Sequence, residues 1–188
     1  MGCTSSENNK QETIKKKGNN RNSFIKVPTL PNENRNGFDI INIREKALQL
    51  HNEFRKKHNS PELKKNEELN EMAQKYAENL IKNKNKNKKG FQYNIFNNIL
   101  LGENIIISNK KTPEDICNKW YKESDCYDFS LNKYQKNSGH FTQMIWKETK
   151  EFGFGFCFDN ESNFCAVALY YPAGNILGEF SKNIQKSN

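Results

Sequence analysis

Residues 138–155 read SGHFTQMIWKETKEFGFG, and two different periodicities follow each other within this stretch. The apolar spacing of HFTQMIW predicts a short helix. From Phe152 to Phe158 every other residue is phenylalanine, with glycine or cysteine in between, and this period of two predicts a strand. Residues 166–171 alternate in the same way, so we expect an antiparallel pair of strands with a turn at 159–162.

Three further helices are predicted outside this stretch. Apolar residues recur at helical intervals over 43–54 and over 69–80, and Asn-Ser-Pro at 59–61 ends the first of these patterns. The third helix is predicted by its start signals, with Thr112 as the N-cap and Pro113 at the first helical position. Helices that precede and separate antiparallel strands indicate an α+β fold, with helices on both faces of a small antiparallel sheet.

The chain divides into three parts by composition. Residues 1–38 contain many asparagines, two prolines and little periodicity, which predicts a disordered tether. Residues 39–184 carry the periodic segments and form the predicted domain, and 185–188 are a short tail. No apolar run approaches the ~20 residues of a membrane-spanning helix. The N-terminus lacks the apolar core of a signal peptide, so we do not expect secretion by that route.

The formal net charge of +8 raises the question of a nucleic-acid partner. However, the lysines gather in two polar runs, at 10–17 and 82–89, and no readout motif or aromatic stacking pattern accompanies them. Anionic lipid headgroups explain the first run better, and a solvated loop explains the second. We therefore expect no binding of nucleic acid.

The first six residues, MGCTSS, fit a pattern for N-terminal acylation. Removal of Met1 would expose Gly2 for myristoylation, with Ser6 at the position where the pattern requires a hydroxyl, and Cys3 is placed for palmitoylation. One myristoyl chain gives only marginal membrane binding, whereas a second acyl chain or a basic patch makes it stable. Both second signals are present, since the basic flank that follows consists of Lys10, Lys15, Lys16, Lys17 and Arg21.

The cysteine count is odd, with five residues and no CxxC spacing, so a cysteine zinc site is not expected. Cys157 and Cys165 flank the predicted turn and could face each other across the strands. We expect reduced, packed thiols because no secretory signal is present, and a Cys157–Cys165 disulfide is the alternative.

Four sequence blocks, in order, resemble the signature segments of the CAP family (cysteine-rich secretory proteins, antigen 5 and class 1 pathogenesis-related proteins). They are HNEFRKKHNSPEL (51–63), GEN (102–104), SGHFTQMIW (138–146) and YYPAGN (170–175). The acylation-type start makes the chain most similar to the intracellular, Golgi-associated branch, whose members bind negatively charged lipids. The resemblance implies an α-β-α sandwich with a polar central cavity.

In typical members two histidines and two glutamates line this cavity. This chain matches only part of that set. Glu103, Glu123 and His140 match three of the four positions. The earlier histidine belongs near Lys88, but residues 81–102 contain no histidine. A zinc site takes three or four ligands, so Glu103, Glu123 and His140 remain metal candidates of low selectivity, and we do not expect zinc as a certain cofactor.

These observations favour a non-catalytic protein that is tethered to a membrane and binds lipid or sterol. The location expected is intracellular, on the cytoplasmic face of the Golgi or plasma membrane, with the lipid surface as partner. One alternative is a metal-dependent or serine–histidine hydrolase that uses His140 with Glu103 and Glu123, and Ser138 as nucleophile. Another is a membrane scaffold that self-associates or binds protein partners.

Overall fold

The computed structural model describes residues 39–82, 95–109, 112–158 and 163–187. The predicted tether at 1–38, with its acylation site and basic flank, and the predicted turn at 159–162 lie outside the described residues. The helices and strands, in chain order, are α1 (Ile40–Lys57), β1 (Lys64–Lys65), α2 (Glu67–Lys82), β2 (Ile95–Phe96), β3 (Ile99–Leu100), β4 (Gly102–Asn109), α3 (Pro113–Tyr121), α4 (Gly139–Ile145), β5 (Glu151–Phe158), β6 (Asn163–Tyr171) and α5 (Phe180–Asn183). Two 3-10 turns, Lys122–Cys126 and Phe129–Leu131, connect α3 to α4.

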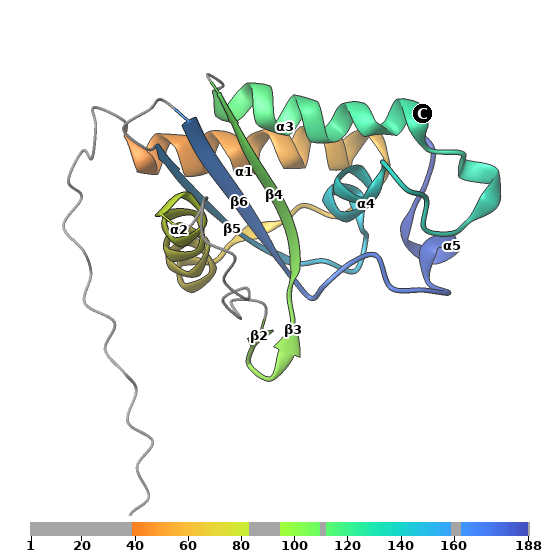
Figure 1. Cartoon of the computed structure of the whole chain (residues 1–188). Helices are drawn as coiled ribbons and strands as arrows, with labels where there is room; N and C mark the ends of the chain where they lie inside the picture. The colour runs from red at the N-terminus through yellow and green to blue at the C-terminus, as the bar shows by residue number, and fades with distance from the viewer. Residues whose placement is uncertain (1–38, 83–94, 110–111, 159–162, 188) are drawn as a thin grey trace, which may run out of the picture. The chain divides into compact units, whose positions relative to one another are not determined.

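The main sheet has four strands in the order β1-β5-β6-β4 (Figure 1). Strand β6 lies in the middle and pairs antiparallel with both β5 and β4. The predicted antiparallel pair is therefore confirmed. The two-residue β1 pairs parallel with the start of β5, so the sheet is mixed rather than purely antiparallel. Strands β2 and β3 form a separate hairpin.

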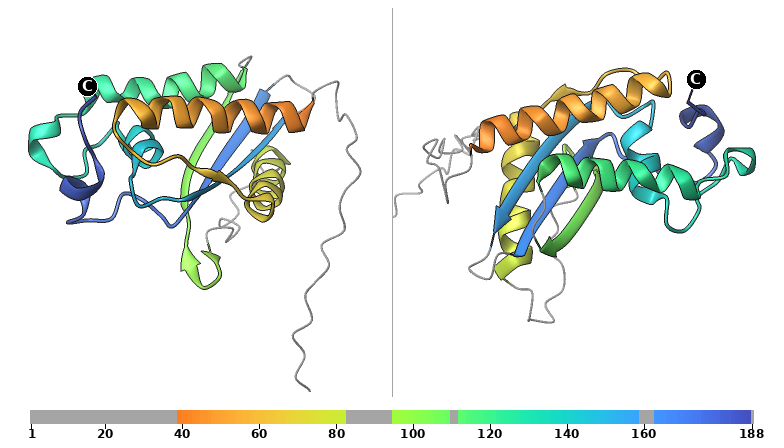
Figure 2. Two further views of the ribbon diagram at one scale, coloured as in Figure 1. Left: turned by 180° about the vertical axis from the view of Figure 1, so that it is seen from behind. Right: turned by 90° about the horizontal axis from the view of Figure 1, so that it is seen from above.

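Helices cover both faces of this sheet, as the sequence predicted. Helices α1 and α3 lie side by side over one face, and α2 lies against the other (Figures 1 and 2). The alternation of β5 explains this arrangement, because its phenylalanines face the core under α1 and α3. Gly153 and Gly155 point the opposite way and let the backbone of α2 pack directly on the strand. No helix in the described ranges has the length and apolar character needed to cross a bilayer.

The third helix shows most directly how sequence sets local structure. Thr112 accepts a hydrogen bond from the N–H of Asp115, and the Asp115 carboxylate accepts one from the N–H of Thr112. This capping box satisfies backbone donors that the first turn of a helix leaves free. Pro113 occupies the first helical position, where no intrahelical N–H is needed. The predicted start of α3 is confirmed.

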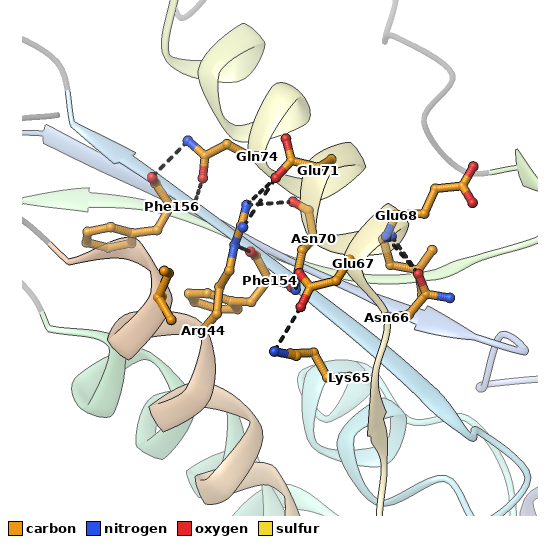
Figure 3. A network of polar contacts seen from close by, with 12 residues as sticks. Arg44, Lys65, Asn66, Glu67, Glu68, Asn70, Glu71, Gln74, Phe154 and Phe156 are labelled. Carbon is orange, nitrogen blue, oxygen red and sulfur yellow. Dashed lines mark hydrogen bonds and ion pairs between the residues drawn. The ribbon is translucent and has the colours of Figure 1, made fainter. Parts of the chain in front are cut away.

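Strand β5 pairs with β1 only at its first two residues. After these, side chains from α1 and α2 form hydrogen bonds with the β5 backbone (Figure 3). The N–H of Phe154 donates to Asn70 Oδ1 at 2.8 Å, and Gln74 makes hydrogen bonds with both the N–H and the C=O of Phe156. Arg44 of α1 donates from Nε to the C=O of Phe154 and forms an ion pair with Glu71 at 3.3 Å. These contacts join α1, α2 and β5.

Candidate functional site

The predicted cavity residues Glu123 and His140 meet where α4 begins. Glu123 lies in the 3-10 turn that follows α3, and its Oε2 accepts hydrogen bonds from the N–H groups of His140 and Phe141 at 3.0 and 3.4 Å. These N–H groups belong to the first turn of a helix, where a carboxylate also interacts favourably with the helix dipole. Glu123 therefore ties the start of α4 to the end of α3.

The imidazole of His140 is held on two sides. Its Nδ1 lies 2.6 Å from Glu123 Oε1, and its ring stacks on Trp120, with 5.8 Å between ring centroids and an interplanar angle of 26°. The side chain stays 38% exposed. With Nδ1 donating to the carboxylate, Nε2 is the acceptor, and no hydrogen bond to it is found among the described residues. The ring is thus oriented, with one nitrogen available to a ligand or to solvent.

Glu103, the third predicted cavity residue, has a different environment. It lies on β4, opposite Leu169 of β6, and so belongs to a strand rather than to a loop. Partial burial raises the pKa of its carboxyl group, and a hydrogen bond with the Tyr76 hydroxyl of α2 opposes that rise. Tyr76 was not predicted as a partner, because α2 and β4 are distant in sequence.

The structure does not support the predicted metal candidates. Within the described residues, no three His, Cys, Asp or Glu side chains form a group that could hold a metal ion. Glu123 and His140 are engaged with each other, and the carboxylate of Glu103 is engaged with Tyr76. A zinc site needs at least three converging ligands, so the residues present do not fit this metal.

The Ser138 hydroxyl, the nucleophile of the hydrolase alternative, is turned into the protein. Ser138 is fully buried, and its Oγ donates to the C=O of Gln135 at 2.9 Å. A serine nucleophile must instead share a hydrogen bond with its base. The structure places Ser138 beside His140 in the chain but does not bring the two side chains into that arrangement.

A buried hydrogen-bond chain joins all four signature blocks. His51 Nδ1 lies 2.7 Å from the C=O of Ala47 and must carry the proton, so Nε2 accepts from the Tyr170 hydroxyl at 2.8 Å. Asn104 Nδ2 donates to the Tyr170 oxygen and to the C=O of His140, at 3.0 and 3.1 Å. The chain thus runs from α1 through the sheet to α4. His51 therefore has a structural role, since it links α1 to the sheet.

The burial of His51 predicts that acid destabilises the protein. Burial lowers the pKa of this imidazole from its ordinary value of 6.5 to about 3, with a smaller opposing effect of the hydrogen bond to Ala47. The unfolded chain therefore takes up a proton near pH 6.5 that the folded chain refuses until about pH 3. Stability is full above pH 6.5 and falls as the pH drops through this window, by up to about 1.4 kcal/mol per pH unit.

We expect the free energy of unfolding to be about 2 kcal/mol lower at pH 5 than at pH 7 through His51 alone. Urea unfolding at the two pH values measures this difference. His51→Gln should remove this part of the pH dependence, although the variant will be less stable at both pH values. An unchanged pH dependence in His51→Gln would contradict the assignment. His58, whose pKa burial also lowers, adds to the slope in both proteins.

Cys157 and Cys165 face each other across β5 and β6 and are not joined by a disulfide. Cys165 is fully buried, and burial raises the pKa of its thiol well above the ordinary value. Only the thiolate attacks a disulfide or an oxidant, so this thiol is poorly reactive. The pairing alternative is not realised in this structure.

Comparison with known proteins identifies the family to which this chain belongs. Residues 48–171 match the family model described as CAP, the cysteine-rich secretory protein family, and the chain belongs to this family. It is 34% identical over 146 residues to Golgi-associated plant pathogenesis-related protein 1 of Homo sapiens, which covers 73% of this chain and 89% of that protein.

Solved structures agree on the fold. Venom allergen-like protein 4 of Schistosoma mansoni superimposes with a TM-score of 0.62 at 20% identity, covering 78% of this chain and 95% of that one. A structure of NaASP2 with Zn²⁺ superimposes with a TM-score of 0.53 at 22% identity, covering 78% of this chain and 86% of that one. These likenesses confirm the α-β-α sandwich. At such identities they concern the fold alone, so the zinc of NaASP2 is a property of that protein.

Proposed function

We propose that this CAP protein is a non-catalytic, membrane-tethered module that binds lipid or sterol on an intracellular membrane. The observation that carries the proposal is the start MGCTSS with its basic flank, joined to a complete CAP-type sandwich. The similarity to a human protein named for its association with the Golgi favours that organelle, and acylation at Gly2 and Cys3 favours its cytoplasmic face. Two acyl chains and a basic patch together suffice for stable anchoring.

The geometry around His140 supports a binding role over catalysis. Its Nδ1 and the Glu123 carboxylate serve to fasten α4, and the Ser138 hydroxyl is turned toward Gln135. Neither a nucleophile nor a group of metal ligands converges on the imidazole in the described part of the chain. A ring nitrogen that is oriented and partly exposed suits a hydrogen bond to the polar end of a bound lipid or sterol.

Flotation with liposomes tests the tether. We expect the acylated wild-type chain to float with vesicles that contain phosphatidylserine, and Gly2→Ala to lose most of this association, because palmitoylation of Cys3 also depends on the membrane contact that the myristoyl chain at Gly2 provides. Cys3→Ser should retain a weaker, salt-sensitive association through the myristoyl chain and the basic flank.

Ser5→Ala is the matched control, since it lies in the same segment but outside the pattern positions. It should float like the wild type. If both Gly2→Ala and Cys3→Ser still localise to membranes in cells, the tether is wrong. Mass spectrometry of the protein purified from its native cell would read out the acyl groups and any bound lipid directly.

A further inference from the structure

The β2–β3 hairpin presents aliphatic side chains to solvent instead of burying them. Ile95 is 50% exposed, Ile99 43% and Leu100 59%. Figure 1 shows this hairpin extending past the main sheet, on the far side from α1 and α3. Exposed apolar residues that gather on one projecting element indicate an interaction surface more often than scattered ones do.

The hairpin geometry fixes these side chains in place. Its two-residue turn, Asn97-Asn98, has positive φ at both positions (48° and 61°), as the tightest hairpin turns require. The register pairs Ile95 with Leu100, so these two lie next to each other on one face. Ile95 and Leu100 therefore form one aliphatic patch across both strands, whereas Ile99 pairs with Phe96 and lies on the other face, next to the turn.

A buried aromatic contact holds the hairpin to the domain. Phe96 is only 8% exposed and packs edge-on against Tyr171 of β6, with 5.3 Å between ring centroids. Leu101, just after β3, is likewise buried. The inner side of the hairpin thus belongs to the core, and only its outer side and the residues at its tip are left for a partner.

The surrounding sequence indicates what that partner is. Residues 90–102 contain no charged side chain, whereas 82–89 hold five lysines. The lysine run, predicted above as a solvated loop, also suits a bilayer with anionic headgroups, because cations interact with the headgroups while aliphatic side chains enter the acyl boundary beneath them.

We propose that Ile95 and Leu100 insert into the surface of an anionic membrane and orient the CAP domain on it. This inference deepens the proposed function and rests on it, since the N-terminal acyl chains would bring the hairpin to the bilayer. The acyl chains alone would attach only the start of the tether at 1–38 to the membrane. The hairpin would supply a second point of contact, within the folded domain.

Tryptophan emission can test this insertion directly. The two native tryptophans, Trp120 and Trp146, are buried and contribute a constant background. In the acylated full chain with Leu100→Trp, we expect a blue shift and protection from acrylamide on vesicles of phosphatidylcholine with phosphatidylserine. Ile41→Trp, at a similarly exposed aliphatic position of α1, is the matched control and should stay accessible to the quencher.

A second variant measures the contribution to affinity. Ile95→Ser combined with Leu100→Ser should weaken partitioning of the unacylated full chain onto the same vesicles by about tenfold or more. Because both side chains are exposed, the variant should fold like the wild type, and circular dichroism checks this.

The outcomes separate the two proposals. If acylated Leu100→Trp floats with vesicles but its emission and quenching do not change, the hairpin inference is wrong and the tether stands. If unacylated Leu100→Trp shows the blue shift while Gly2→Ala floats like the wild type, the tether is wrong and the hairpin inference stands. Equal partitioning of the double serine variant and the wild type would also overturn the hairpin inference.

Discussion

Replacing Arg55 with methionine is expected to lower the free energy of unfolding by about 3 kcal/mol or more. Arg55 is fully buried in α1, and its guanidinium donates to four backbone carbonyls: Pro61 at 2.6 Å, Met144 at 2.8 Å, Trp146 at 2.9 Å and Thr149 at 3.0 Å. Methionine keeps most of the volume but removes the guanidinium donors from these buried acceptors, and within the described ranges only the Trp146 carbonyl keeps a second hydrogen bond, from the N–H of Thr149.

The loss of stability should exceed that of an ordinary surface substitution, because Arg55 supplies the hydrogen bonds that water would otherwise make to the backbone carbonyls of a whole segment. Three carbonyls of the chain from the end of α4 to Thr149 accept from the guanidinium, and among them only that of Trp146 also accepts a backbone hydrogen bond from a described residue, from the N–H of Thr149 at 3.2 Å. Burial lowers the pKa of Arg55 to about 10, so the group remains charged at neutral pH. Arg55→Lys should recover only part of the loss, since one ammonium cannot reach acceptors spread over this arc.

Urea unfolding followed by circular dichroism measures the effect. Lys56→Met is the matched control, because Lys56 is the next residue of the same helix and is exposed. That variant should stay within about 0.5 kcal/mol of the wild type. A cost below about 1 kcal/mol for Arg55→Met would mean that water enters and satisfies the carbonyls instead.

Gly155→Ala is the second substitution with a large expected effect. A methyl group on Gly155 would lie 2.1 Å from the backbone carbon of Ala73 in α2, and one on Gly153 would lie 2.2 Å from the backbone carbon of Leu69. Backbone atoms cannot rotate away as a side chain can, so the whole of α2 must move off the sheet. We expect a cost of about 3 kcal/mol, at the upper end of overpacking effects.

Gly139→Ala serves as the control for this prediction. The nearest atom to its added methyl group would be a ring carbon of Tyr134 at 3.4 Å, an ordinary contact. Thermal unfolding of Gly155→Ala, Gly139→Ala and the wild type should show a large fall in Tm only for the first. Equal Tm values for all three would mean that α2 is less tightly docked than the structure shows.

The sequence predicted the elements that have a clear periodicity or a clear start signal. The alternation from Phe152 to Phe158 predicted the strand, and Thr112-Pro113 predicted the start of α3. By contrast, β1 is missing from the prediction because its two lysines carry no alternation. Its pairing depends on where the chain lies after α1, which no local pattern specifies.

The candidate site was predicted in part, for a similar reason. Matching motifs identified Glu123 and His140, which meet as expected. They also grouped Glu103 with these two, whereas the structure gives Glu103 a separate partner in Tyr76. The contact between Asn104 and Tyr170 depends on the pairing of β4 with β6, and a sequence motif does not contain the register of strands that lie far apart in the chain.

The way α2 binds β5 has a consequence for how the protein behaves at high local concentration, as on a membrane. A strand with free backbone groups is a template on which further chains can assemble into fibrils. Asn70 and Gln74 accept hydrogen bonds from the N–H groups of Phe154 and Phe156, as a neighbouring strand would. Arg44 donates to the carbonyl of Phe154 (Figure 3). The outer side of a helix has no row of unpaired backbone groups with which another strand could pair. Further strands therefore cannot add to the sheet at the edge that α2 covers.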